Sequence, residues 1–188
     1  MARAANSLRQ MVDYQVMLSV PNVEIVSKEA ATELLGKSKN PKLVAIRQDF
    51  TGAFSGRALL IFPEASSLEL VRVVVGRQLS LEDIVNLEDE ALAETGNIIL
   101  NSWVATIANL LKSGLKMSLP TVVRGDSRQM FKSDDNQNLV LFLHIKFEIS
   151  TKEIRGYVAL LMDIPSVGEL RLLIADFVAN ATKPNQSR

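Results

Sequence analysis

Alternating and near-continuous apolar runs mark two predicted β-hairpins in this chain. The first pairs Leu43 to Phe50 with Gly56 to Ile61, and the second pairs Leu139 to Phe147 with Gly156 to Leu161. The runs that begin at Leu43 and Leu139 are rich in β-branched and aromatic residues, which favour strands. Glycines fall where the first hairpin must turn. The pattern therefore predicts two antiparallel hairpins that are far apart in the sequence.

A helical period replaces the alternation between residues 88 and 113. Leu92, Ile99 and Trp103 fall on one side of the predicted helix, which spans about seven turns, or about 40 Å at 1.5 Å per residue, and stops at Gly114. Just before it, Ser80-Leu81-Glu82-Asp83 has the pattern of a capping box and begins another helical stretch.

The chain repeats itself with an offset near 100 residues. Ser19-Val20-Pro21 matches Ser118-Leu119-Pro120, the two hairpins match each other, and Glu69 to Arg72 matches Glu169 to Leu172. Each copy consists of a helix, a short strand around the proline, a hairpin and a helix. One copy alone would expose an apolar sheet face. We therefore expect a single α+β domain over residues 1–180, made of repeats 1–79 and 80–180, with one continuous antiparallel sheet, long helices on one face, and a polar tail at 181–188.

Composition excludes several classes of function. Lys plus Arg and Asp plus Glu both number 21, so the net charge is zero, which argues against a nucleic-acid-binding surface. The chain has no cysteine and only one histidine, His144, which excludes disulfides and multi-histidine metal sites. There is no signal-peptide pattern, and the longest apolar run, Tyr157 to Met162, is too short to cross a bilayer. We expect a cytoplasmic protein with no metal site of its own.

A polar stripe interrupts the otherwise apolar long helix. Glu90, Glu94 and Asn97 are spaced i, i+4 and i+7, so they stack along one helix face, and Asn101 lies one turn further on. Such a stripe offers a partner a carboxylate for ion pairing and an amide that can orient water. By itself the same spacing is also typical of a solvated helix face.

The distance to a proline distinguishes these interpretations. Twenty-two residues separate Asn97 from Pro120. The arrangement resembles the signature of the CheC/CheX/FliY family of response-regulator phosphatases: an acidic residue or serine, three residues, Glu, two residues, Asn, 22 residues and Pro. The segment Gly52-x-x-x-Gly56 with Leu59 and Phe62-Pro63 is also similar to the family, and the resemblance runs from about Arg3 to Phe177. The chain has Glu90 where the family usually has Asp or Ser.

The resemblance implies a CheC-like fold and hydrolysis of the aspartyl phosphate of a CheY-type response regulator, in chemotaxis or two-component signalling. It implies that Asn97 holds a water in line with phosphorus and that Glu94 pairs with the active-site lysine of the receiver. Glu90 and Asn101 would assist binding. The receiver would supply Mg²⁺, so this chain needs no cofactor. The alternative is a non-catalytic receiver-binding or flagellar-switch-type scaffold module, but a pure docking surface does not need the amide of Asn97.

The repeat predicts only one such site in this chain. Asn97 lies twenty-three positions before Pro120. The position twenty-three residues before Pro21 would fall upstream of Met1. Either the chain is a fragment of a longer protein, with a receiver domain possible upstream, or it is a one-site protein; we favour the fragment. A helix over Ala4 to Val12 would then be truncated, and the sheet near Ile46 or Leu60 would be less covered. The oligomeric state is left open.

Overall fold

The computed structural model describes residues 16–36, 42–75, 81–132, 139–149, 152–162 and 164–181. The helix predicted over Ala4 to Val12 lies outside the described residues. So does the predicted polar tail, apart from Ala181, which ends the last helix. The predicted domain limits and the fragment interpretation therefore stay predictions.

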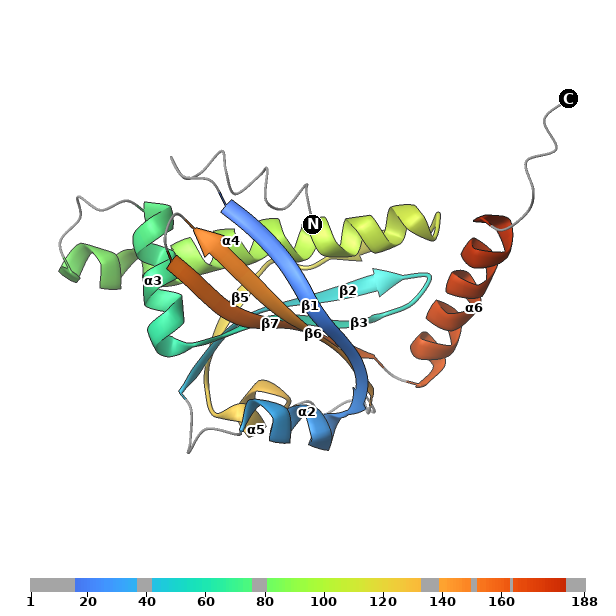
Figure 1. Ribbon diagram of the computed structural model, residues 1–188, viewed down its shortest axis with the longest axis horizontal. Helices are drawn as coiled ribbons and strands as arrows, with labels where there is room; N and C mark the ends of the chain where they lie inside the picture. The colour runs from blue at the N-terminus through green and yellow to red at the C-terminus, as the bar shows by residue number, and fades with distance from the viewer. Residues whose placement is uncertain are drawn as a thin grey trace, which may run out of the picture.

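Seven antiparallel strands form one sheet in the order β1-β6-β7-β3-β2, and β4 and β5 both pair with the outer side of β2 (Figure 1). The single antiparallel sheet expected from the repeat is confirmed. The elements are β1 (Val16–Ser27), α2 (Lys28–Leu35), β2 (Leu43–Gly52), β3 (Gly56–Pro63), α3 (Glu64–Val75), α4 (Leu81–Leu110), β4 (Leu115–Met117), β5 (Thr121–Gly125), α5 (Ser127–Met130), β6 (Leu139–Ile149), β7 (Lys152–Met162) and α6 (Ile164–Ala181).

Both edges of the sheet are interrupted at a proline. Along β1 the register with β6 shifts between Ser19 and Asn22, around Pro21. At the other edge, Ser118-Leu119-Pro120 separates β4 from β5. Proline has no N–H to donate to a ladder, so it is tolerated at an edge strand or a bulge. The two prolines thus occupy matching places, as the repeat predicts.

The two halves of the chain exchange their edge strands. β1, from the first half, pairs with β6 of the second half, whereas β4 and β5, from the second half, pair with β2 of the first. The central contact is between β3 and β7, where Gly56 pairs with Met162 and Ile61 with Tyr157. The halves are therefore interlocked rather than placed side by side.

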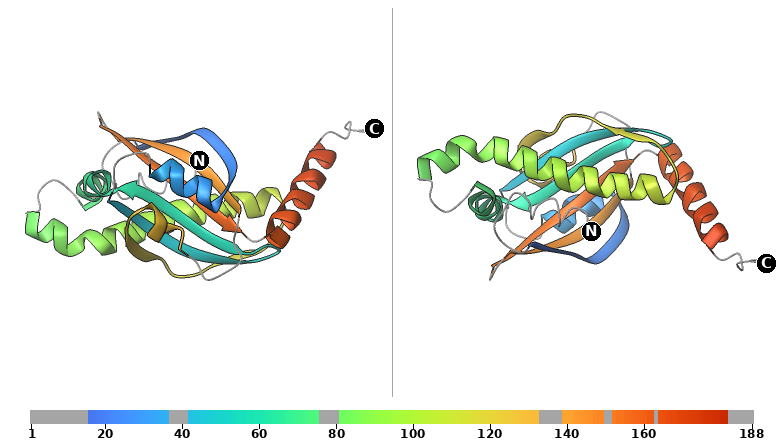
Figure 2. Two further views of the ribbon diagram at one scale, coloured as in Figure 1. Left: turned by 90° about the horizontal axis from the view of Figure 1, so that it is seen from below. Right: turned by 90° about the horizontal axis from the view of Figure 1, so that it is seen from above.

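Helices cover both faces of the sheet (Figures 1 and 2). The long helices α3 and α4 pack over one face, on a core that includes Ile46 and Leu60, as expected. The short helices α2 and α5 cover the other face. Ser27 caps α2, and Asp126 caps α5 in a capping box with Gln129.

Helix α4 is longer than the sequence pattern predicts. We expected a helical stretch from Leu81 and a separate helix over residues 88–113, but one continuous helix runs from Leu81 to Leu110. The chain leaves it through Lys112, whose φ of 51° is left-handed. The polar stripe therefore lies near the middle of a long helix that is fixed at several points.

The expectation that Ile46 or Leu60 would be poorly covered is wrong. Both side chains are fully buried, because α3 and α4 lie over this part of the sheet. The exposed apolar side chains are elsewhere: Val23 and Ile25 on β1 are 54% and 65% exposed. Helix α6 extends away from the body of the molecule and exposes Phe177 (Figure 2).

An ion pair in the first hairpin makes stability depend on pH. Asp49 faces Arg57 across β2 and β3, and its Oδ1 lies 2.9 Å from Arg57 Nε. Burial opposes ionisation of this carboxyl, but the hydrogen bond and charge of Arg57, aided by Arg47, hold the pKa of Asp49 below its ordinary value. A carboxyl with a lowered pKa stabilises the fold above the pKa of the unfolded chain, about 3.9, and that stability is lost as the pH falls through the folded-state value.

We therefore expect the free energy of unfolding to fall below about pH 4, and to fall less in Asp49→Asn. At neutral pH the substitution should cost about 1 kcal/mol or less, because the Asp49 side chain is half-exposed and solvent screens the pair. Urea unfolding at a series of pH values measures both effects. Asp176→Asn, on the exposed side of α6, is the control. Identical pH profiles for Asp49→Asn and the unsubstituted chain would contradict the assignment.

Candidate functional site

A glycine lets α4 approach the sheet closely beside the polar stripe. A Cβ built on Gly96 would lie 2.6 Å from Cβ of Ile46, a buried residue of β2. Carbon atoms without a bond between them cannot approach so closely, so only glycine permits this helix–sheet distance. The close approach brings the next residue, Asn97, within hydrogen-bonding reach of β2.

The four residues predicted from the sequence all lie on α4, but they fall into two groups. Glu90 and Glu94 are exposed, and within the described ranges neither carboxylate forms an ion pair. Asn97 and Asn101 are half-buried and bonded to each other, with Asn101 Nδ2 donating to Asn97 Oδ1 at 2.7 Å. The helix thus presents two unpaired acids to solvent and holds the two amides at the edge of the sheet.

Asn97 is held from the sheet as well as from its own helix. Gln48 of β2, only 1% exposed, donates from Nε2 to Asn97 Oδ1 at 3.1 Å. The same Nε2 also donates to the backbone oxygen of Ser118 at 2.9 Å. Asn97 Oδ1 therefore accepts two hydrogen bonds, one from Gln48 and one from Asn101.

These bonds fix which atom of the Asn97 amide faces outward. A backbone carbonyl only accepts, so the atom of Gln48 beside Ser118 must be Nε2. The same Nε2 then requires an acceptor in Asn97, which is Oδ1. Both lone pairs of Oδ1 are used, and within the described part of the chain no acceptor takes a hydrogen bond from Asn97 Nδ2. The free polar group of Asn97 is therefore a donor.

The proline of the signature lies in the bend between β4 and β5 that also contains Ser118. Ser118 N donates to the oxygen of Asp49 at 2.8 Å, and Ser118 Oγ accepts from Asp49 N at 2.9 Å. The ladder resumes only at Thr121, which pairs with Arg47, because Pro120 cannot donate. In this bend Leu119 is 86% exposed, so a bare apolar side chain stands next to the residue that anchors Gln48.

An ion-paired arginine fixes α4 on the N-terminal side of the stripe. Arg124 of β5 places Nη2 2.6 Å from Asp89 Oδ1 and 3.2 Å from Glu88 Oε2. The hydrogen bond to Asp89 raises the pKa of Arg124 above its already high ordinary value, so the guanidinium stays charged. Glu88 and Asp89 thus share an ion pair with Arg124, whereas Glu90 and Glu94 have no ion-pair partner among the described residues.

Sequence reasoning missed Gln48 and the role of Ser118. The side chains of β2 that face α4 are Val44, Ile46, Gln48 and Phe50. A single amide in an otherwise apolar face was the available signal, because a buried polar group is costly unless it has a partner. The partner itself could not be identified, since Asn97 lies 49 residues further along the chain.

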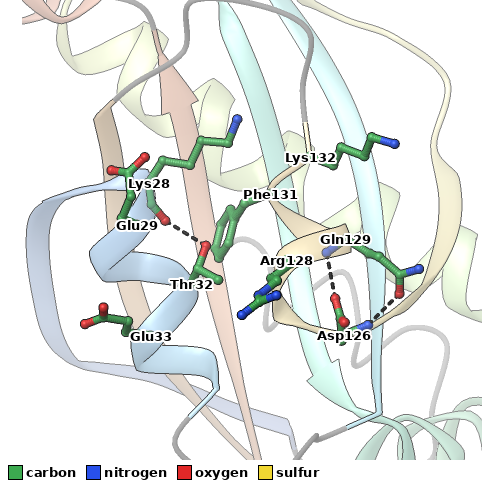
Figure 3. A pocket seen from close by; sticks show the side chains of 9 residues that line it. All are labelled: Lys28, Glu29, Thr32, Glu33, Asp126, Arg128, Gln129, Phe131 and Lys132. Carbon is green, nitrogen blue, oxygen red and sulfur yellow. Dashed lines mark hydrogen bonds between the residues drawn. The ribbon is translucent and has the colours of Figure 1, made fainter.

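A hollow lies on the opposite face of the sheet, between α2 and α5 (Figure 3). Several of its polar groups already have local partners: Thr32 Oγ1 donates to the oxygen of Lys28, and Asp126 and Gln129 form the capping box of α5. It contains none of the predicted site residues. Across the described ranges there is no group of three or more acidic or histidine residues placed to hold a metal ion.

Comparison with known proteins identifies the family. The family model for the chemotaxis phosphatase CheX matches residues 44–144, which include Gln48, the whole polar stripe and Pro120. The chain belongs to the CheX family. The predicted relationship to the CheC/CheX/FliY group is thereby confirmed. In the part of the chain that is described, no helix has the length and hydropathy needed to cross a membrane.

Individual relatives of this CheX-family chain are distant. The CheY-P phosphatase CheC of Bacillus subtilis (strain 168) is 25% identical over 122 residues, which are 63% of this chain and 58% of that protein. The fold is similar to that of FliY from Thermotoga maritima, with a TM-score of 0.70 at 15% identity over 93% of this chain and 89% of that one. The fold is also similar to that of a chemotaxis protein CheX from Desulfovibrio desulfuricans, with a TM-score of 0.54 at 17% identity. That match covers 85% of this chain and 94% of the other. These structures show the shared fold.

Proposed function

We propose that this CheX-family chain hydrolyses the aspartyl phosphate of a CheY-type receiver domain. The observation that carries the proposal is the amide of Asn97, which is fixed by two hydrogen bonds and keeps a free donor at the end of an acidic stripe. A surface that only docks a partner has no need to orient an amide in this way. Family membership and the similarity to a CheY-P phosphatase support the same conclusion.

In the proposed complex, the exposed acids of the stripe bind the receiver and Asn97 acts on the phosphoryl group. Glu94, exposed and unpaired among the described residues, forms an ion pair with the active-site lysine of the receiver. Glu90 adds a second negative charge one turn away, and the exposed Leu119, next to Ser118, supplies an apolar contact. These contacts place Asn97 over the phosphoryl group and exclude bulk water.

Asn97 then acts on the attacking water through its nitrogen. Nδ2 donates to one lone pair of the water oxygen, which leaves the other lone pair free to face phosphorus in line with the leaving carboxylate of the receiver. Catalysis by positioning suits phosphoryl transfer, in which the protein has little covalent chemistry to perform. Asn101 serves the site by holding Asn97 Oδ1. In this proposal Mg²⁺ comes with the receiver, as the family resemblance implies.

The direct test is loss of phosphate from a purified CheY-type receiver that has been phosphorylated with acetyl phosphate in the presence of Mg²⁺. We expect the chain to accelerate this loss at sub-stoichiometric concentration, which shows turnover. Binding of the phosphorylated receiver without acceleration would overturn the proposal in favour of the scaffold alternative. Absence of both binding and acceleration would contradict both functions.

Charge reversal at Glu94 should weaken docking. We expect Glu94→Lys to lower the affinity for the phosphorylated receiver about tenfold or more, because a lysine would oppose the lysine of the receiver. The loss should shrink as ionic strength rises, since salt screens both the attraction and the repulsion. Titration calorimetry at low and at high salt measures both effects. Glu33→Lys on α2, across the sheet, is the matched control; unchanged affinity of Glu94→Lys at low salt would exclude the ion pair.

A further inference from the structure

Gln48 is out of place for a residue that serves packing alone. It lies among Val44, Ile46 and Phe50 on the face of β2 that α4 covers, and it is 1% exposed. Its Oε1 is buried, and no group in the described ranges donates to it. A buried acceptor without a partner costs about 1–3 kcal/mol, so a methionine of similar length would serve the core better.

The repeat provides an internal comparison for this position. In the first half, Arg47 pairs with Thr121, the residue after Pro120, and Gln48 follows Arg47. In the second half, His144 pairs with Asn22, the residue after Pro21, and Ile145 follows His144. Ile145 is also buried in the same core. The fold therefore accepts an apolar side chain opposite a proline bend, and the amide is present only opposite the bend at Pro120, where it reaches Asn97.

We propose that Gln48 is a positioning residue that couples the Ser118-Leu119-Pro120 bend to Asn97, an inference that rests on the proposed phosphatase function. The bend presents a backbone oxygen at a fixed place, and this oxygen holds Nε2 of Gln48. Nε2 in turn holds Oδ1 of Asn97. This link gives a physical reason why the signature has a proline at a set distance from the asparagine. The interruption of the strand at the proline leaves the oxygen of Ser118 as an acceptor for Gln48, and Gln48 in turn orients the amide of Asn97.

The coupling works together with Asn101. If Gln48 could not donate, Asn97 Oδ1 would keep only the bond from Asn101, which lies on the same helix and moves with it. The Asn97 amide could then turn and present Oδ1 in place of Nδ2. Gln48 thus determines the orientation of Asn97, whereas the exposed acids determine where the receiver docks. Loss of Gln48 should lower kcat and leave KM nearly unchanged.

The test is Gln48→Met, which keeps length and volume but cannot donate, with Ile145→Met as the matched control in the other half. We expect Gln48→Met to lower kcat for the phosphorylated receiver between about 10- and 100-fold, the range found for small misplacements of catalytic groups. KM should change little, the thermal midpoint of Gln48→Met should hold or rise, and Ile145→Met should leave kcat unchanged. An unchanged kcat in Gln48→Met would overturn the inference, as would equal losses of kcat in the two variants.

Two further measurements separate positioning from a structural role. In an Asn97→Ala background, Gln48→Met should cause no additional loss of kcat, because both substitutions act through one amide. An additional tenfold loss would overturn the inference. Independently of activity, nuclear magnetic resonance should show one rigid set of Asn97 side-chain amide signals that becomes averaged or doubled in Gln48→Met but not in Ile145→Met. If the unsubstituted chain has no phosphatase activity, the proposed function fails, while unaltered Asn97 signals in Gln48→Met would overturn the positioning role.

Discussion

Asn97→Ala should lower the rate of receiver dephosphorylation about 10²- to 10³-fold, the loss that follows removal of one preorganised donor from a transition state. The affinity for the phosphorylated receiver should change little, because Glu94 and Leu119 form the docking contacts in the proposed complex. The fold should also persist, since Gln48 keeps its bond to the oxygen of Ser118. Single-turnover decay of the phosphorylated receiver at saturating concentrations of the chain measures the chemical step directly.

Two further variants make this result specific. Asn97→Asp keeps the shape of the side chain, and its oxygens can still accept from Gln48 and Asn101, but it has no outward donor and adds a negative charge near the phosphoryl group. We expect it to be as inactive as Asn97→Ala. Asn109→Ala replaces an exposed asparagine nearer the end of the same helix and should be fully active. A rate in Asn97→Ala above about half that of the unsubstituted chain would exclude the catalytic role.

Gly96→Ala should damage both stability and activity, although alanine is the better helix former by about 1 kcal/mol. The added methyl group would overlap the buried Ile46, whose Cβ is too near the backbone to swing aside. Overpacking a core costs about 1–3 kcal/mol, so a net loss is expected, and each kcal/mol lowers the thermal midpoint of a chain of this size by about 2–4 °C. Because α4 must lift from β2, Asn97 would also move from Gln48, and turnover should fall up to about 100-fold.

The control is Gly168→Ala, in helix α6, where an added Cβ meets no atom within 4 Å. In Gly168→Ala no steric overlap opposes the gain in helix propensity, so the thermal midpoint should stay the same or rise slightly. Differential scanning calorimetry of the two variants, with the phosphatase assay on each, separates helix propensity from helix–sheet contact. A midpoint in Gly96→Ala equal to or above that of Gly168→Ala would show that α4 tolerates a larger separation from the sheet.

Much of the fold could be predicted because local patterns and the internal repeat agreed. The β-branched runs from Leu43 and Leu139 identified both hairpins, and the matched prolines at 21 and 120 indicated a further strand in each copy. The helical period placed the stripe of Glu90, Glu94 and Asn97 correctly on one long helix. The short helices α2 and α5 were missed because each depends on a single capping residue, Ser27 or Asp126, rather than on a long periodic pattern.

The environment of the site could not be predicted in the same way. The spacing of the signature shows that Pro120 belongs with Asn97 but does not show what joins them, because Gln48 reaches both from a different strand. The exchange of edge strands was also hidden. The hydrophobic pattern of an edge strand is compatible with pairing to either hairpin. The pairing that forms depends on how the whole sheet assembles, which is a non-local property.

The exchanged edge strands also determine how the chain can reach its native state. Ser27 of β1 pairs with Leu139, and Val16 pairs with Ile149, so β1 leaves the ribosome long before its partner strand is made. Contacts so distant in sequence close late and slowly, since the loop entropy must be overcome before they form. Neither half should therefore be a folding unit. Peptides obtained by dividing the chain between Val75 and Leu81 should each remain unfolded, and should regain structure in a single cooperative step only when they are mixed.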